Sequence, residues 1–209
     1  MTAKRIVVVS AGLSTPSSTR QLADRLTADA VALLGERGVE TEVRVFELRD
    51  LAHDIVNHLL QGFAPPKLQE LLDALESADG LIAVTPIFTT SYAGLFKSFI
   101  DVVDPQAIVD LPVLIGATGG TARHSLAIDY AVRPLFTYLH AVPVTTGVYA
   151  ATSDWGNDGD GVRSLPERVR RGAGEFAELV ERSTRADRVR DPFALDRPFD
   201  HSVGGFTGE

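Results

Sequence analysis

Short apolar runs alternate with longer amphipathic segments along most of the chain. Ile6 to Val9 is β-branched and apolar at every position, as in a parallel strand buried on both faces. In the next segment apolar residues recur at helical spacing until Gly38, a residue type that commonly ends a helix. The same alternation continues, and it predicts strands over residues 6–9, 41–46, 80–85, 111–118 and 143–149.

Helices are expected wherever leucine, alanine or phenylalanine recurs every three or four residues. Such segments lie between residues 22 and 38, 65 and 75, 95 and 103, 121 and 139, and 164 and 185. Residues 51–63 are ambiguous between a short helix and a loop, and residues 86–94 are expected to form a loop. Strands that alternate with helices predict one doubly wound α/β domain around a parallel sheet.

The apolar periodicity ends after the last predicted helix. Residues 186–209 are charged and contain Pro, Gly and three Phe. We therefore expect a domain over residues 1–185 and a C-terminal tail over 186–209. The tail is expected either to be mobile or to form an arm whose Phe193, Phe199 and Phe206 pack on a neighbouring subunit.

The composition narrows the classes of function. The 209 residues are 44% hydrophobic and 23% charged, which allows a sizeable core. The net charge of −8 disfavours binding to nucleic acids or to an anionic membrane surface, since both need a basic patch. The sequence has no cysteine, which excludes disulfides, thiolate metal sites, iron–sulfur clusters and cysteine nucleophiles. No apolar run approaches the roughly 20 residues of a membrane span and no signal-peptide layout precedes the first strand, so we expect a cytoplasmic protein.

The segment after the first strand, residues 10–20, is rich in small hydroxyl side chains. Ligands of open parallel sheets bind beyond the carboxyl ends of the strands, which is where this segment lies. Its hydroxyls, its backbone N–H groups and the start of the next helix suit an anion. The segment lacks the glycine patterns of dinucleotide and nucleoside-triphosphate sites, so a monophosphate is favoured. The alternative is a helix N-cap with additional serines.

Two further loops follow predicted strands. After the third strand, Phe88 and Tyr92 lie beside Pro86 among hydroxyl residues, and such aromatic side chains suit a planar apolar ligand. Core packing is the alternative for both rings. After the fourth strand, Gly119 and Gly120 allow backbone amides to approach a ligand closely. A plain turn would use the same glycines.

Together these loops resemble the NADPH-dependent FMN reductase family of the flavodoxin-like fold. Residues 86–97 are similar to its Pro-x-(aromatic)-x-x-Ser-x-x-Gly-x-(Leu)-Lys pattern, and Asp101 lies where the family has an Asp. The stretch 118–135 is closer still and looks like the flavin reductases of two-component alkanesulfonate monooxygenase systems, as does 147–150. The resemblance covers roughly residues 6 to 150.

The resemblance implies a flavodoxin-like three-layer sandwich with a five-stranded parallel sheet in the order 2-1-3-4-5. It implies FMN with its phosphate in the first loop and its ring between the other two, reduced by NADPH or NADH, and reduced flavin passed to a partner flavin-dependent monooxygenase. It also implies homodimers or homotetramers, with Tyr130 in a π-helical bulge at the tetramer interface. Pro134 in the same helix independently predicts a kink or bulge. The cofactor-binding residues expected from the three loops are Ser10, Ser17, Ser18, Thr19, Arg20, Pro86, Ile87, Phe88, Thr89, Thr90, Ser91, Tyr92, Thr118, Gly119, Gly120 and Thr121.

The first loop departs from the family, which usually has Gly-Ser-x-Arg where this chain has Ser10-Ala11-Gly12 and a longer spacing. Arg20 is expected either to neutralise the phosphate or to be a solvated helix residue. Arg123 and His124 are expected either to contact the incoming nucleotide or to lie on the surface. Asp129, one helical turn from an arginine, is expected to pair with it.

No catalytic side chain and no metal site is expected. Hydride transfer from a nicotinamide to a flavin needs no protein acid or base, because the cofactor does the chemistry. His53, Asp54 and His58 do not share one helical face, and no further ligand lies nearby in the sequence. Two other functions compete with flavin reduction, namely an FMN-containing quinone or azo reductase and a non-enzymatic flavodoxin-like electron carrier.

Overall fold

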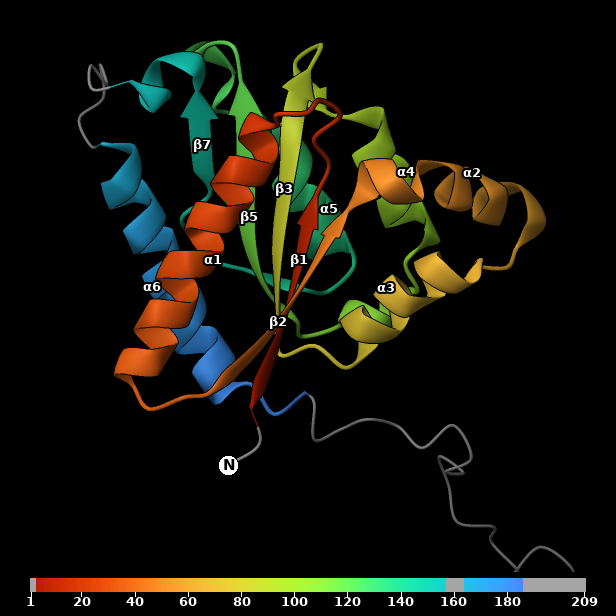
Figure 1. Ribbon diagram of the computed structural model, residues 1–209, viewed down its shortest axis with the longest axis horizontal. Coiled ribbons are helices and arrows are strands. Elements are labelled where there is room, and N and C mark those ends of the chain that lie inside the picture. Colours follow the sequence, from red (N-terminus) through yellow and green to blue (C-terminus); the bar gives the residue numbers. More distant parts are fainter. Residues whose placement is uncertain (1–2, 157–163, 186–209) are drawn as a thin grey trace, which may run out of the picture.

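A parallel sheet with helices on both faces forms the described part of the chain, residues 3–156 and 164–185, in a computed structural model (Figure 1). The predicted tail, 186–209, lies outside the described residues. The strands are β1 (Lys4–Ser10), β2 (Thr41–Glu47), β3 (Gly80–Phe88), β4 (Ser91–Tyr92), β5 (Pro112–Gly119), β6 (Val142–Pro143) and β7 (Val148–Ala151). Neighbouring strands follow the order β2-β1-β3-β5, and β6 and β7 both pair with β5 in parallel. This is the order 2-1-3-4-5 of the main strands, and the flavodoxin-like prediction is confirmed.

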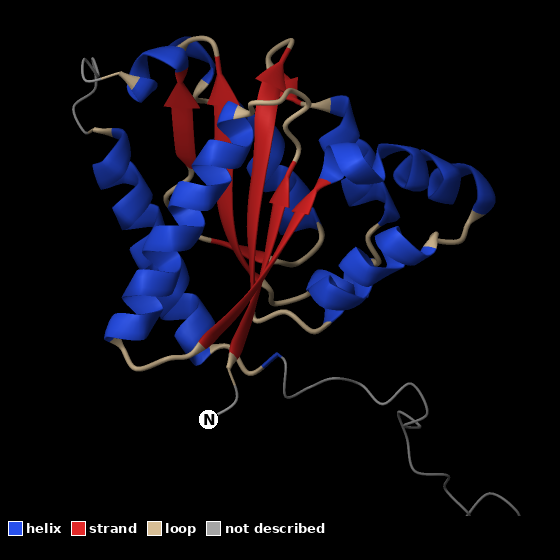
Figure 2. Cartoon of the chain, viewed as in Figure 1, coloured by secondary structure: helices blue, strands red, loops and turns tan. Residues whose placement is uncertain are grey.

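Helices on the two faces of this sheet make three layers (Figure 2). The α-helices are α1 (Ser18–Glu36), α2 (Ala52–Gln61), α3 (Pro66–Glu76), α4 (Gly94–Val102), α5 (Arg133–Tyr138) and α6 (Leu165–Arg182). Shorter 3-10 turns are η1 (Leu48–Leu51), η2 (Pro105–Ile108), η3 (Ala122–His124) and η5 (Thr152–Trp155), and η4 (Ile128–Val132) is a π-helix. Within the described ranges, none of these helices has the length and apolarity to cross a bilayer.

The apolar run of β1 is explained by burial on both faces. Ile6 and Val8 belong to the apolar cluster that contains α1 and α6, whereas Val7 and Val9 belong to the cluster of α3, α4 and α5. All four side chains are at most 2% exposed. An apolar run such as residues 6–9 is therefore what a central position between two helical layers requires.

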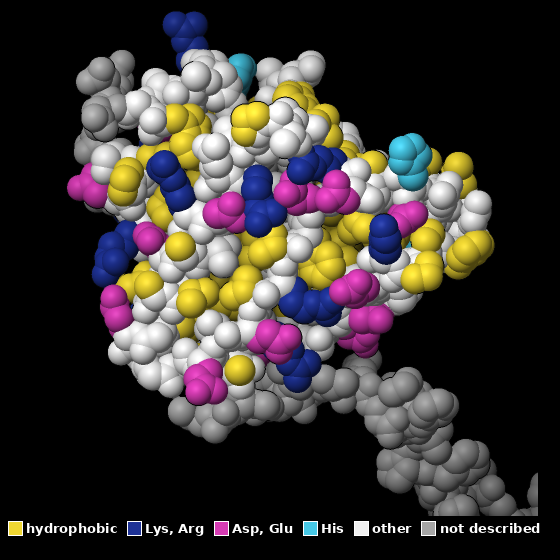
Figure 3. Space-filling model, viewed as in Figure 1, with side chains coloured by type: hydrophobic (Ala, Val, Ile, Leu, Met, Phe, Trp, Pro, Cys, Tyr) yellow, Lys and Arg dark blue, Asp and Glu magenta, His cyan; other side chains and the backbone are white. Residues whose placement is uncertain are grey.

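The ambiguous segment 51–63 is mainly helical. It forms α2, which ends at Gly62 in the left-handed conformation with φ of 78°. Within α2 only Ile55 is buried, while Val56 and Leu60 are exposed. Apolar side chains accordingly gather over α2 at the right-hand edge of Figure 3, and acidic and basic side chains are interspersed over the rest of that face.

The fifth strand predicted over 143–149 is interrupted, so the prediction of one continuous strand is wrong. Between β6 and β7 the Val144 amide still donates to the Val113 carbonyl of β5 at 2.9 Å, but the groups that follow bond to side chains instead. Arg133 donates to two successive carbonyls at 2.7 and 2.9 Å, and Glu175 accepts from the Thr146 amide at 2.7 Å and from its hydroxyl at 2.6 Å. These side chains come from α5 and α6, so the local apolar pattern contains no sign of the break.

The helix predicted from the glycine turn to Leu139 is divided into η3, η4 and α5. Pro134 lies in the first turn of α5, where the backbone N–H that proline lacks would have no hydrogen-bond partner within the helix. Tyr130 lies inside the π-helix, so the predicted bulge is confirmed. The expected pair of Asp129 and Arg133 forms at 2.9 Å across one helical turn.

Candidate flavin site

The three predicted loops lie beyond the carboxyl ends of β1, β3 and β5, which are neighbours in the sheet (upper edge in Figure 1). A hydrogen bond of 2.9 Å joins the buried hydroxyls of Thr19 and Thr118. The Ala11 amide donates to the Val84 carbonyl, also at 2.9 Å. The first loop is therefore held against the ends of both β3 and β5, as the sequence predicted for a shared site.

The first loop forms a tight cup at the start of α1. The Ser17 hydroxyl caps this helix by accepting from the Arg20 amide at 3.2 Å. A Cβ at Gly12 would lie 2.0 Å from Ser17 Oγ, so only glycine fits beneath the cap. Ser10 is fully buried, and its Oγ has no hydrogen-bond partner among the described residues. A buried hydroxyl without a partner beside the free N–H groups of a helix start fits a phosphate group.

Two arginines near this cup have different surroundings. Arg20 pairs with Asp24 at 2.7 Å and with Glu47 at 2.9 Å. The hydrogen bond to Asp24 and the two negative charges raise the pKa of Arg20, whose guanidinium therefore already has two carboxylate partners. Arg49, which sequence reasoning missed, donates to the Ser14 carbonyl at 2.8 Å and so braces the loop from η1.

The second loop is a β-hairpin and not the predicted irregular loop. β3 extends to Phe88 and pairs antiparallel with β4, so that Thr89 and Thr90 form the turn. Their φ angles of 48° and 68° lie in a region that β-branched residues rarely occupy, and such strain concentrates at functional sites. Phe88 is 49% exposed, whereas Tyr92 packs on Phe96 with 6.3 Å between ring centroids. One of the two predicted aromatic side chains is thus open to a ligand.

The other predicted residues lie at different depths. Pro86 and Ile87 are buried within β3, and Ser91 is half-buried in β4. Ser18 and Gly120 are exposed. The buried members therefore form the wall that supports the loops, and the exposed members form the rim.

The third loop is anchored by Tyr149. Its hydroxyl donates to the Thr121 carbonyl at 2.9 Å. A Cβ at Gly119 would lie 2.1 Å from the oxygen of the Tyr149 hydroxyl. Burial, together with the charge of Asp154, raises the pKa of Tyr149, so the hydroxyl remains a donor. The role of Tyr149 depends on the pairing of β5 with β7, which the expected strand order 2-1-3-4-5 includes.

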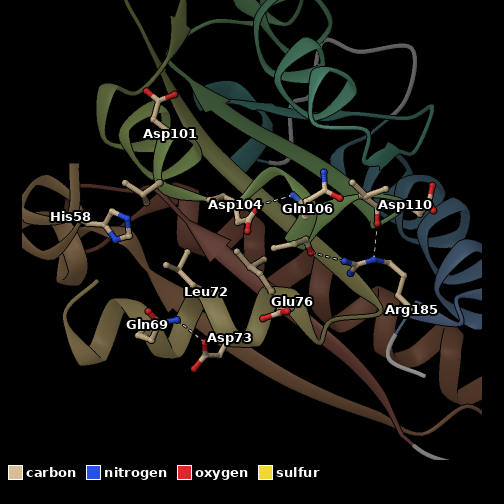
Figure 4. Close-up of a pocket in the computed structure, with 15 residues that line it drawn as sticks. His58, Gln69, Leu72, Asp73, Glu76, Asp101, Asp104, Gln106, Asp110 and Arg185 are labelled. Atoms are coloured by element: carbon tan, nitrogen blue, oxygen red, sulfur yellow. Dashed lines mark hydrogen bonds between the residues drawn. The ribbon is translucent and has the colours of Figure 1, made fainter. Parts of the chain in front are cut away.

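A cleft of about 780 Å³ lies at the opposite, amino edge of the sheet, between α3 and the end of α4 (Figure 4). Asp73, Asp104 and Asp110 are among its lining residues, and none of the three loops contributes to it. Arg185 borders it and donates to backbone carbonyls at 2.8, 2.8 and 2.5 Å. An acidic wall disfavours a phosphate, so this cleft is not the flavin site.

Comparisons with known proteins identify the family of this chain. Residues 4–156 match the NADPH-dependent FMN reductase family. An FMN reductase (NADPH) from Pseudomonas aeruginosa is 39% identical over 175 residues, which cover 84% of this chain and 91% of that protein. An NADH-dependent FMN reductase, SfnF, from Pseudomonas fluorescens is 36% identical over 175 residues, with coverage of 84% and 91%.

The solved structure of an oxidoreductase from Corynebacterium diphtheriae has a TM-score of 0.82 and 45% identity to this chain. The match covers 86% of this chain and 97% of that one. All three loops of the site lie within the residues that match the family. The chain therefore belongs to the NADPH-dependent FMN reductase family and is an NAD(P)H:FMN oxidoreductase.

Proposed function

We propose that this chain oxidises NADPH or NADH, reduces FMN held by the three loops, and supplies the reduced flavin to a flavin-dependent monooxygenase. The observation that carries the proposal is the convergence of the Ser17 cup, the Thr89–Thr90 turn and the Gly119 turn at one edge of the sheet. Membership in the family supports the same reaction.

The first loop is proposed to bind the phosphate of FMN, and the other two loops its ring. The buried Ser10 hydroxyl and the start of α1 take the phosphate. The exposed ring of Phe88 and the backbone of Thr89 and Thr90 border the flavin ring on one side, and the amides around Gly120 border it on the other. FMN supplies the hydride-accepting ring, so the protein binds and aligns the reactants.

The exposure of the ring-binding loops supports an exchanging flavin. Phe88 is 49% exposed, and Thr89 and Thr90 are also exposed. A ring bound there is only partly enclosed, which suits a flavin that arrives, is reduced and leaves for a partner enzyme. Exchange of the flavin would distinguish the proposed reductase from a carrier that retains its flavin.

An exposed apolar surface around the π-helix supports a homodimer or homotetramer. Leu126 is 61% exposed, Tyr130 79% and Tyr138 83%. Large apolar side chains gathered at a surface commonly mark an interface. Light scattering tests this proposal, because Tyr130→Asp should lower the mass of an assembly that Tyr130 joins and should leave any other assembly intact.

The proposed reaction is tested by following nicotinamide absorbance with NADPH and with NADH, each with and without added FMN. Oxidation that rises with free FMN supports the reductase. Oxidation that requires a quinone or an azo compound, with flavin retained, indicates the second enzyme class. No oxidation of either nucleotide contradicts both enzymes and leaves the electron carrier.

The phosphate site is tested by replacing Ser17 and Ser18 together with alanine. We expect weaker binding of FMN and unchanged binding of riboflavin, which lacks the phosphate, in fluorescence titrations. Ser164→Ala is the matched control, because Ser164 is the N-cap residue of α6 and lies outside the three loops. Unchanged FMN affinity in the double variant would show that the loop is assigned wrongly.

A further inference from the structure

Arg123 differs from the other cations around the flavin loops. Arg20 pairs with Asp24 and Glu47, Arg49 contacts Glu47 at 3.0 Å, and Lys97 contacts an aspartate at 2.5 Å. Among residues 3–156 and 164–185, the Arg123 side chain has neither an ion pair nor a hydrogen bond. It is exposed, so a positive charge without a partner stands at the rim of the site.

The backbone beneath Arg123 is fixed although its side chain is free. Tyr149 donates to the Thr121 carbonyl at 2.9 Å, and the Thr121 hydroxyl accepts from the Arg123 amide at 3.4 Å. The Tyr149 hydroxyl also fills the space where a Cβ of Gly119 would lie. The guanidinium is therefore carried on an anchored loop next to the amides proposed to border the flavin ring.

When a nicotinamide stacks on the flavin ring between the second and third loops, the rest of the dinucleotide must lie outside this space, along the rim of the site. NADPH differs from NADH by one phosphate on the adenosine ribose, a group that carries more than one negative charge near neutral pH. A chain of net charge −8 needs a local cation to hold that phosphate, and arginine binds phosphate through paired N–H donors.

We infer that Arg123 recognises the 2′-phosphate of NADPH and that this chain therefore prefers NADPH to NADH. The inference rests on the proposed function, since it concerns the nucleotide that reduces the flavin. It gives Arg123 a role in specificity and none in the hydride transfer itself. The relatives include both NADPH- and NADH-dependent reductases, so this choice of nucleotide is a property that differs within the family.

The test is steady-state kinetics of Arg123→Ala, Arg123→Lys and Arg123→Glu with both nucleotides at saturating FMN. We expect Arg123→Ala to raise KM for NADPH about 10- to 100-fold, the range for losing a charge-assisted contact, with kcat and the KM for NADH unchanged. Lysine should restore part of the affinity and glutamate should weaken it further. Lys67→Ala is the matched control, because Lys67 is an exposed cation of α3, outside the three loops.

Calorimetric titration with NADP⁺ and NAD⁺ gives a second readout that does not require turnover. Arg123→Ala should weaken NADP⁺ binding by the same factor and leave NAD⁺ binding unchanged. Equal effects on both nucleotides, no effect on either, or a wild-type preference for NADH would overturn the inference. If the wild type oxidises neither nucleotide the proposed function fails, and the titration still decides on Arg123.

Discussion

The packing of Gly12 under the Ser17 cap leads to a quantitative prediction. A Cβ at position 12 would lie 2.0 Å from Ser17 Oγ, 3.2 Å from Ser17 Cβ and 3.1 Å from Thr19 Cβ. The shortest contact is relieved when the Ser17 hydroxyl rotates away, but the hydroxyl then no longer accepts from the Arg20 amide. Loss of an N-cap costs about 1 kcal/mol, and crowding at the two carbon contacts adds about 1 kcal/mol more.

We therefore expect Gly12→Ala to lower the free energy of unfolding by about 2 kcal/mol and Ser17→Ala to lower it by about 1 kcal/mol. Both variants lose the same cap, so the double variant should be less destabilised than the sum by about 1 kcal/mol. Urea unfolding of the wild type, the two single variants and the double variant measures this coupling. Strictly additive energies would refute the contact between Gly12 and Ser17. Each single variant should also bind FMN more weakly while binding riboflavin normally.

Two further predictions concern the other loops. Tyr149→Phe leaves the Thr121 carbonyl without its donor and should cost about 1 kcal/mol in urea unfolding. Because burial raises the pKa of Tyr149, its contribution is complete below the unfolded value of about 10 and is lost as pH rises through the folded value. The wild type should therefore lose stability more steeply than Tyr149→Phe above pH 10, and equal slopes would contradict this. Replacing Thr89 and Thr90 with Asn-Gly should raise the free energy of unfolding by about 1 kcal/mol, since these residues favour left-handed turns, and an unchanged melting temperature would argue against strain at the turn.

Features of the fold that depend on local pattern were predictable, and those that depend on distant contacts were not. The β-branched run of β1 and the helix ended by Gly38 each carry their signal within a few residues. The hairpin turn at Thr89 and Thr90 gives no such signal, because threonine is not the residue expected at positive φ. Arg49 was missed for another reason, since it reaches the first loop from η1 only after β2 has paired with β1.

In the predicted site, too, features with a local signal were predictable and features that depend on distant contacts were not. An N-cap with additional serines was the alternative expected for the first loop, and the cap is Ser17, because α1 begins at the next residue. Arg20 was also a candidate phosphate ligand because of its place near the start of a helix. Its guanidinium, however, contacts Glu47 at the end of β2. The sequence shows the charge of an arginine, but it does not show which distant carboxylate forms an ion pair with it in the fold.

The interrupted last strand also limits how this protein meets other chains. An edge strand with free amides and carbonyls can add a strand from a neighbour and so begin aggregation. Here two carbonyls of the gap accept from Arg133, and the Thr146 amide donates to Glu175. Burial acts to raise the pKa of Glu175, but its hydrogen bonds from Thr146 outweigh this and hold the pKa below the usual range. The protected edge therefore persists under mild acidification, and this edge of the sheet should resist the association that a long, unbroken outer strand allows, whereas β2 at the other edge is such a strand.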